Sequence, residues 1–383
     1  MHKIKRIAII LLVGVALFIM SQTFIAVDVT QRAIVVGLGI DFDKEKEYYQ
    51  VCAEIVSTGQ TDQSTGVFTK MVYASGQTVA QCMVNLSTAT GKEMSLGQAI
   101  IIMSGEDAVK DVSVQKTLAY FDVSNAFKEG TLLVACKGKA YDFFQQRPAT
   151  SASVSFALAQ LFPDDHWQAV SASVLLRFLE KQIAVGHTGF INVVDLVEQE
   201  EIGSTKEQSE KKPMIYKINS CAVFKENYYQ TLLEGEAQKG FILLSPEVVG
   251  QTFCVPYDGD RPDYMPPQAT LTLHDKKVDV SCEGNDKIKI KFEMEVKQSK
   301  TDDYFLGSPL TPQSYKELTK TMLDEVGQRA KEEITAFVDF CKQNDLDVFG
   351  FSKVFYSKKG KKWEELNLSV KDFDFEIQVE AKE

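Results

Sequence analysis

The sequence predicts an α+β protein of three domains, with an N-terminal membrane anchor helix and a C-terminal antiparallel sheet packed on one long helix. Three observations lead to this prediction. Strand-like and helix-like segments alternate through the first half of the chain, which is typical of a mixed α/β domain. Near the C-terminus, two stretches alternate apolar and polar residues on either side of a long segment with helical spacing. At the N-terminus, basic residues precede an apolar run.

The expected domain boundaries follow from two breaks in this pattern. The stretch EEIGSTKEQSEKKP has many charges and no periodicity, so a boundary is expected near residues 202–213. The stretch VPYDGDRPDYMPP contains four of the ten prolines, so a second boundary is expected near residues 256–267. The predicted organisation is an anchor at 1–27, an α/β domain at 28–202, a small middle domain at 213–258 and a C-terminal domain at 266–383.

Composition excludes several classes of function. The formal net charge is −11 and no basic stripe with interleaved aromatics is present, so a nucleic acid is not an expected partner. The seven cysteines contain no CxxC pair, which argues against zinc and iron–sulfur sites, and no cofactor is expected. Several cysteines lie inside apolar patterns, so buried free thiols are the favoured interpretation.

The N-terminal segment predicts a single membrane-spanning helix. Residues 7–27 reach the length of about 20 mostly apolar residues that a bilayer requires, although SQT interrupts them. A cleaved signal peptide is the main alternative, but only a weak cleavage site at Thr23 is present, and a buried soluble helix is the third. The positive-inside tendency places the basic flank in the cytoplasm and the rest of the chain outside. The expected anchor residues are Ile7, Leu11, Leu12, Val15, Leu17 and Phe18, and the flank is Lys3, Lys5 and Arg6.

Periodicity predicts the order of elements in the α/β region. Strands are expected first, then a helix begins near Thr78, a buried strand follows it, and helix, strand and short helix complete the block. The sequence WQAVSASVLLRFLEKQIA has one apolar face and predicts a further helix, followed by an extended or short helical segment. The expected segments are 33–40, 48–56, 68–76, 78–87, 99–105, 114–124, 130–140, 141–146, 167–184 and 189–199. In the middle segment, 214–224 is expected as a strand, 225–229 as a turn, and 230–245 as a short strand and a short helix.

The last domain has the clearest patterns. KIKIKFEMEVK and FDFEIQVEA have period two, which predicts strands with one buried and one solvent-exposed face. The long helix between them is expected to begin at Thr311 as N-cap, with Pro312 in the first helical position. At about 1.5–3 kcal/mol for each large apolar side chain buried, its stripe outweighs the cost of about 1 kcal/mol for one internal glycine. The stripe comprises Leu318, Met322, Leu323, Val326, Ala330, Ile334, Phe337, Val338 and Cys341.

Two sequence motifs could indicate chemistry, and neither supports an enzyme. In AIVVGLGIDFDKEKEYYQVCAEIV, the third glycine of a dinucleotide fingerprint is replaced by Phe42, and a calcium loop counted from Asp41 has Lys46 where it needs glycine. The stretch is therefore interpreted as two strands joined by a solvated acidic turn. DDHW at 164–167 could pair a carboxylate with His166, but a helix N-terminus explains it better. An exported hydrolase using DDHW is the least favoured function.

The stretch NDLDVFGFSKVFY is expected to end the long helix and enter a strand. Asn344 could provide the left-handed residue at the helix end. Phe351 is expected either in the core or, exposed, at a surface that binds a partner. Trp363 is a second candidate for that partner interface.

Four stretches together resemble the Ger(x)C family, the C subunit of spore nutrient-germinant receptors. They are AIVVGLGIDFDKEKEYYQVCAEIV, the block from SLGQAIIIMSG to CKGKAYDFF, CAVFKENYYQTLLEGEAQKGFILLS, and DLDVFGFSKVFY followed by Trp363 and the last strand. The resemblance implies a three-domain α+β protein without enzymatic activity on the outer face of the spore inner membrane. It also implies assembly with membrane-spanning A and B subunits. The family typically carries a lipid-modified cysteine after its signal sequence, whereas this chain has Ser21 and no cysteine there, so the intact helix is expected to serve as the anchor.

The sequence thus supports two main functions. The first is a non-catalytic, membrane-anchored C subunit of a nutrient germinant receptor. The alternative is an extracytoplasmic protein that binds a small ligand or a wall glycan in a cleft between its domains.

Overall fold

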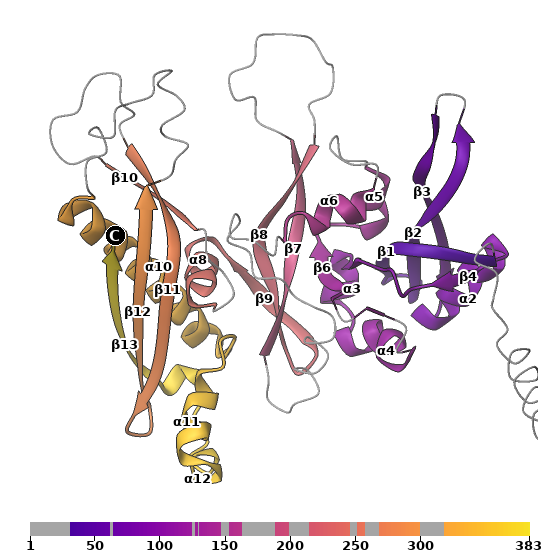
Figure 1. Ribbon diagram of the computed structural model, residues 1–383. Coiled ribbons are helices and arrows are strands. Elements are labelled where there is room, and N and C mark those ends of the chain that lie inside the picture. The colour runs from indigo at the N-terminus through magenta and orange to yellow at the C-terminus, as the bar shows by residue number, and fades with distance from the viewer. Residues whose placement is uncertain are drawn as a thin grey trace, which may run out of the picture.

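A computed structural model describes ten parts of the chain: residues 31–61, 64–124, 127–128, 130–146, 153–162, 188–198, 214–245, 251–256, 268–298 and 318–383. They form two sheets that lie side by side, with helices around each (Figure 1). The predicted anchor, its basic flank, the helix expected at 167–184 and the DDHW motif lie outside the described residues. Within the described residues, no helix is long and apolar enough to span a membrane.

The first sheet is mixed, with strand order β3-β2-β1-β5-β6-β7-β8-β9 and β4 beside β1. Its centre is parallel, and antiparallel strands complete both sides. Helices α2 to α4 pack on one face, and α5 and α6 pack on the other. The strands are β1 (Arg32–Asp43), β2 (Tyr48–Thr61), β3 (Ser64–Gly76), β4 (Glu93–Ser95), β5 (Ile101–Ser104), β6 (Leu132–Cys136), β7 (Thr188–Glu198), β8 (Met214–Lys225) and β9 (Tyr228–Glu234). The helices are α2 (Val79–Thr90), α3 (Glu106–Lys110), α4 (Val114–Ser124), α5 (Ala140–Gln145) and α6 (Val154–Ala159).

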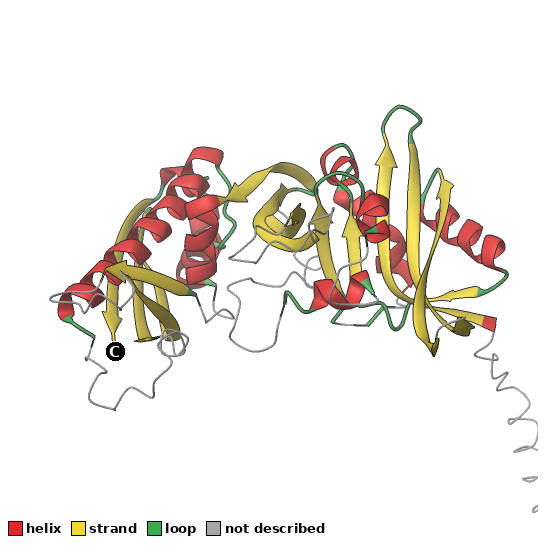
Figure 2. Cartoon of the chain, turned by 90° about the horizontal axis from the view of Figure 1, so that it is seen from above, coloured by secondary structure: helices red, strands yellow, loops and turns green. Residues whose placement is uncertain are grey.

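The second sheet has the order β10-β11-β12-β13, and helices cover one of its faces (Figure 2). The long helix α10 places its apolar stripe against the alternating strands, as the periodicity predicted. The strands are β10 (Thr252–Pro256), β11 (Gln268–Glu283), β12 (Lys287–Gln298) and β13 (Asp374–Lys382). The helices are α8 (Gly235–Leu244), α10 (Lys320–Asn344), α11 (Phe351–Lys359), α12 (Lys361–Glu364) and the 3-10 turn η3 (Val370–Asp372).

This second sheet is not wholly antiparallel, which corrects the prediction. β12 and β13 run parallel, with Ile290 beside Ile377 and Phe292 beside Val379. The cause is α10, which lies between the two strands in the chain and carries it back across the sheet. Alternation shows which face is buried, but it does not show the direction of a strand.

The residues expected to form a middle domain are divided between the two sheets. β8 and β9 extend the first sheet, whereas β10 pairs with β11 in the second. Along β8, side chains alternate between two cores: Ala222 and Phe224 face the first, and Cys221 and Val223 face the second. Within the described residues, β8 therefore contributes side chains to both cores.

Two expectations about the ends of α10 are corrected. The helix begins after Thr319, whose side chain accepts a hydrogen bond from the backbone N–H of Met322, so Leu318 precedes it. The left-handed residue at its end is Asp345, not Asn344.

The expected strand after it is helix α11. The carboxylate of Asp347 accepts hydrogen bonds from the backbone N–H groups of Gly350, Phe351 and Ser352 at 2.9, 2.6 and 2.8 Å. These are the first amides of the helix, which have no partner within it. Asp347 therefore starts a helix in a segment that was expected to enter a strand.

Candidate functional site: the α8 junction

Helix α8 joins the two sheets. It follows β9 directly, and in Figure 1 it lies between the first sheet and the layer formed by α10 and the second sheet. Most of its residues are buried, including Gln238, Gly240 and Phe241. A short helix with most of its residues buried needs neighbours on several sides. We call α8 and the side chains around it the α8 junction.

The helices α8 and α10 touch through their backbones at Gly240. A Cβ atom at this position would lie 2.0 Å from the carbonyl oxygen of Glu333 and 3.0 Å from the Cα of Ile334. Only glycine permits so close an approach. The two helices can therefore pack this closely only in the register that places Gly240 against Glu333.

A row of phenylalanine rings crosses the junction. Phe190 on β7 contacts Phe241 on α8 at 4.8 Å between ring centroids, and Phe241 contacts Phe337 on α10 at 5.3 Å. The row continues through Phe351 to Phe375 on β13, with centroid separations of 6.4 and 5.0 Å. Close aromatic pairs of this kind contribute beyond their buried area. The row makes the first sheet and the C-terminal helices parts of one packed interior.

Phe351 and Trp363 therefore do not present an exposed partner interface. Phe351 is fully buried in this row, and Trp363 is 6% exposed. The Trp363 ring stacks on Phe355 at 5.1 Å, and its Nε1 donates a hydrogen bond to the carbonyl oxygen of Asn285. The stacked ring removes apolar surface from water, and the hydrogen bond satisfies the N–H of Trp363. These side chains therefore belong to the core.

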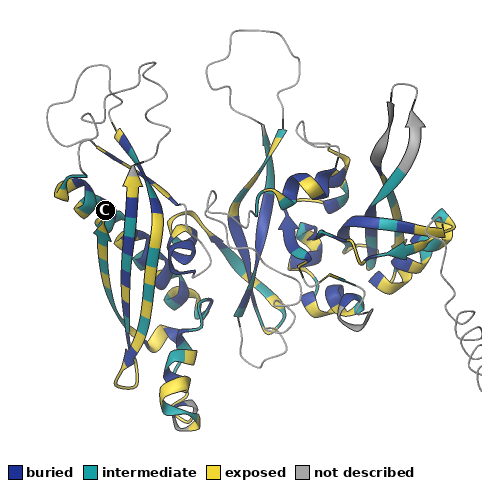
Figure 3. Ribbon diagram, viewed as in Figure 1, coloured by how far each residue is buried: buried dark blue, intermediate teal, exposed yellow. Residues whose placement is uncertain are grey.

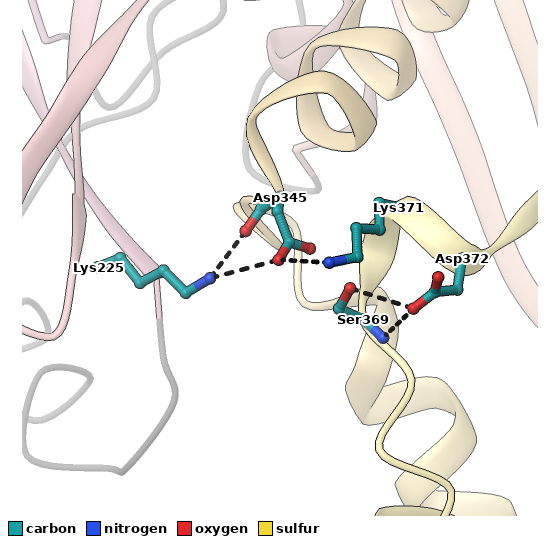
Figure 4. Close-up of polar contacts among 5 residues, drawn as sticks. All are labelled: Lys225, Asp345, Ser369, Lys371 and Asp372. Carbon is teal, nitrogen blue, oxygen red and sulfur yellow. Dashed lines mark hydrogen bonds and ion pairs between the residues drawn. The ribbon is translucent and has the colours of Figure 1, made fainter.

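A polar contact supports the junction at one side. Lys225 ends β8 and donates a hydrogen bond from Nζ to the carbonyl oxygen of Asp345 at 3.0 Å. The Asp345 carboxylate lies 3.8 Å from both Lys225 and Lys371 (Figure 4). Ser369 and Asp372 form a capping box in the same turn as Lys371. The ion pairs are partly exposed, so they contribute orientation more than stability.

Two titratable groups lie at the α8 junction, Glu333 buried and Lys276 partly buried. Burial raises the pKa of the Glu333 carboxyl to about 7, and Gln251 Nε2 donates a hydrogen bond to it at 2.8 Å. Lys276 on β11 donates hydrogen bonds to the carbonyl oxygens of Ile242 and Leu243, near the end of α8. Burial lowers the pKa of this lysine to about 8. A cation at a helix C-terminus interacts favourably with the helix dipole. Sequence periodicity gave no sign of either group.

The acidic stretch near the N-terminus is a hairpin, as predicted, but one of its acids is buried. Asp41 accepts hydrogen bonds from the backbone N–H groups of Ala140 and Tyr141 at 2.7 and 2.9 Å, at the start of α5. Burial raises the pKa of this carboxyl. Gly37 and Gly39 lie where a Cβ would collide with side chains from α6 and from β2, respectively. The glycines therefore allow close packing of β1 against its neighbours.

A second buried carboxylate, Glu54 on β2, orients α6. It accepts hydrogen bonds from Thr69 Oγ1, from the hydroxyls of Ser153 and Ser155, and from the backbone N–H groups of Val154 and Ser155, at 2.5–3.1 Å. Five hydrogen-bond donors surround this buried carboxylate. Without such partners, burial of the group would be strongly unfavourable. The sequence signal was weak: a single acid within an apolar strand.

The described residues contain no cluster of acidic, histidine or cysteine side chains able to hold a metal ion. All seven cysteines are free thiols, and six of them are buried, as their apolar context predicted. The contacts of α8 instead fix the position of β7 and α10 relative to each other.

Comparison with known proteins assigns the chain to a class of proteins. Residues 26–195 match the family described as spore germination protein N-terminal domain, and residues 219–382 match spore germination B3/GerAC like, C-terminal. The crystal structure of the GerBC protein is similar over 90% of this chain and 96% of that chain, with 12% identity and a TM-score of 0.51. No curated protein sequence matches. The class is therefore that of spore germination receptor proteins. The chain belongs to the Ger(x)C family.

Proposed function

We propose that the chain is the membrane-anchored, non-catalytic C subunit of a nutrient germinant receptor on the outer face of the spore inner membrane. It would act by assembling with membrane-spanning A and B subunits. The observation that carries the proposal is the match to both family domains, which together span most of the chain. The N-terminal run of apolar residues after Lys3, Lys5 and Arg6 supports the anchor.

The α8 junction supports a scaffold role. If a partner binds one half of the subunit, a rigid connection between the halves makes the other half move with it. Here the halves share the row of rings and the close contact at Gly240. A hinged cleft for a small ligand or a wall glycan, the alternative function, would need space where α8 is packed.

The test is a mild-detergent purification of the tagged full chain from spore membranes, followed by identification of its partners and measurement of intact mass. We expect two multi-spanning proteins to co-purify, and the chain to retain residues 1–27 without a lipid. A matched control carries the tag on a chain that lacks residues 1–27. Recovery of the full chain alone, from the soluble fraction, would contradict the proposal and favour the binding-protein alternative.

A further inference from the structure

Helices α11 and α12 carry a concentration of positive charge in an acidic protein. Residues 351–363 contain five lysines and no acid, so the rest of the chain has a formal charge of −16, five units more negative than the whole-chain value of −11. Glu364 and Glu365 follow and reduce the local excess to three positive charges over residues 351–366. In Figure 1 the two helices project beyond the end of the second sheet. Charge is therefore segregated toward one end of the molecule.

Four of these lysines are not neutralised by neighbouring carboxylates. Among the described residues, none of Lys353, Lys358, Lys359 and Lys361 forms an ion pair, whereas Lys287 on the nearby sheet pairs with a glutamate at 2.8 Å. Lys358 donates to the carbonyl oxygen of Cys282 at 2.8 Å, and Lys359 donates to Asn285 Oδ1 at 2.6 Å. Hydrogen bonds to neutral oxygens hold these two side chains in place but leave their charges available.

Exposed apolar side chains accompany the charges. Tyr356 is 45% exposed and Leu366 is 44% exposed. Lys353 and Tyr356 are three residues apart on α11, so they share the face opposite the buried Phe351 and Phe355. Figure 3 shows exposed residues along both helices. Exposed lysines on the same helix as an exposed aromatic ring, followed by an exposed leucine just after α12, are typical of a surface that contacts the membrane interface.

We propose that α11 and α12 form a second membrane contact, which binds the headgroups of anionic lipids while Tyr356 and Leu366 enter the interface. This proposal rests on the proposed function, which places the chain next to a membrane. Charge complementarity favours this occupant. An anionic surface attracts the basic end and repels the acidic remainder within a Debye length, about 10 Å at 0.1 M salt. The contact would set the orientation of the anchored subunit.

The experiment uses the full chain with Cys254→Ser and Leu366→Cys, labelled at position 366 with an environment-sensitive fluorophore. It is reconstituted in vesicles of phosphatidylcholine alone or with 30% phosphatidylglycerol. We expect a blue shift and quenching by nitroxide lipids in the anionic vesicles only, and loss of both at high salt. The same label at Val84 on α2, which is 63% exposed, should not respond. Equal signals from position 366 in both kinds of vesicle would overturn the proposal.

Matched variants test the lysines. Lys353→Gln with Lys361→Gln should reduce the membrane-contacting population about fivefold for each lysine. Lys92→Gln with Lys116→Gln, which removes two exposed lysines elsewhere, should leave it unchanged. An undiminished response in the first pair would contradict the proposal.

Flotation of the vesicles separates this proposal from the proposed anchoring. Flotation of the chain with neutral vesicles reports the anchor alone. A chain that floats but shows no lipid-charge response would retain its anchor and lack the second contact. A chain that floats only with anionic vesicles, in a lysine-dependent manner, would lack the anchor and retain the contact.

Discussion

Gly240 on α8 lies against the backbone of Glu333 on α10, where an added Cβ would come within 2.0 Å of the carbonyl oxygen. This contact joins the half of the molecule that contains β9 to the half that contains the long helix. Its neighbours are the row of phenylalanine rings and the buried carboxyl of Glu333 itself. Several testable consequences arise from this region.

Gly240→Ala should destabilise the protein. The methyl group would force the helices apart, and overpacking of this kind costs about 1–3 kcal/mol. Urea unfolding measures the effect. Gly327→Ala on α10 is the matched control, because its Cβ would meet only Ala381 at 4.0 Å and alanine favours a helix by about 1 kcal/mol. Equal stability of the two variants would show that α8 does not pack as described.

The free energy of unfolding should depend on pH through Glu333. Burial raises the pKa of this carboxyl from 4.5 to about 7, while Gln251, Lys239 and Arg329 oppose the shift and Glu236 adds to it. Between these two pKa values the folded protein holds a proton that the unfolded chain has released. Stability from this group is therefore present at low pH and is lost as the pH rises toward 7.

Glu333→Gln tests this dependence. The variant should match the wild type at pH 5 and exceed its stability at pH 8 by about 1–3 kcal/mol, because an amide pays no charging cost. Chemical denaturation at a series of pH values measures the difference. Glu332→Gln, on the exposed side of α10, should follow the wild type throughout. A wild type more stable at pH 8 than the variant would contradict the burial of Glu333.

Phe351→Ala should unfold or strongly weaken the C-terminal half. Phe351 is fully buried, and removing such a ring costs about 3–5 kcal/mol. Tyr356→Ala, five residues further along α11 and 45% exposed, should cost far less. Thermal unfolding followed by near-ultraviolet circular dichroism compares them. A stable Phe351→Ala protein that had lost only its partners would restore the interface interpretation.

Glu54→Gln should destabilise the first domain. The amide group would replace one carboxylate oxygen with a donor facing other donors, such as the hydroxyls of Ser153 and Ser155. Unsatisfied buried groups cost about 1–3 kcal/mol each, so a loss of about 3 kcal/mol is expected. Hydrogen exchange of the α6 amides should increase as well. Glu93→Gln, on an exposed side chain, is the control and should change neither.

Local pattern predicted much of the fold and little of the junction. The alternation in β12 and the stripe of α10 appear in the structure because each concerns a single element with one buried face. The sequence pattern did not indicate the roles of Gly240 and Lys276. Gly240 packs against the backbone of α10 and Lys276 binds carbonyl oxygens of α8, and both partners are distant in the chain. Phe351 carried a signal with two interpretations, since an aromatic residue after a helix suits a core and an interface equally.

By itself, the sequence determined the elements with strong period, the class of the chain as a mixed α and β protein, and the family that its four stretches resemble. Only the tertiary structure decided that β13 runs parallel to β12, that β8 and β9 join one sheet while β10 joins the other, and that Phe351 is interior. The physical reason is the range of the interactions. Periodicity reports which face of an element avoids water, whereas the partner that covers this face is chosen by packing between residues far apart in the chain.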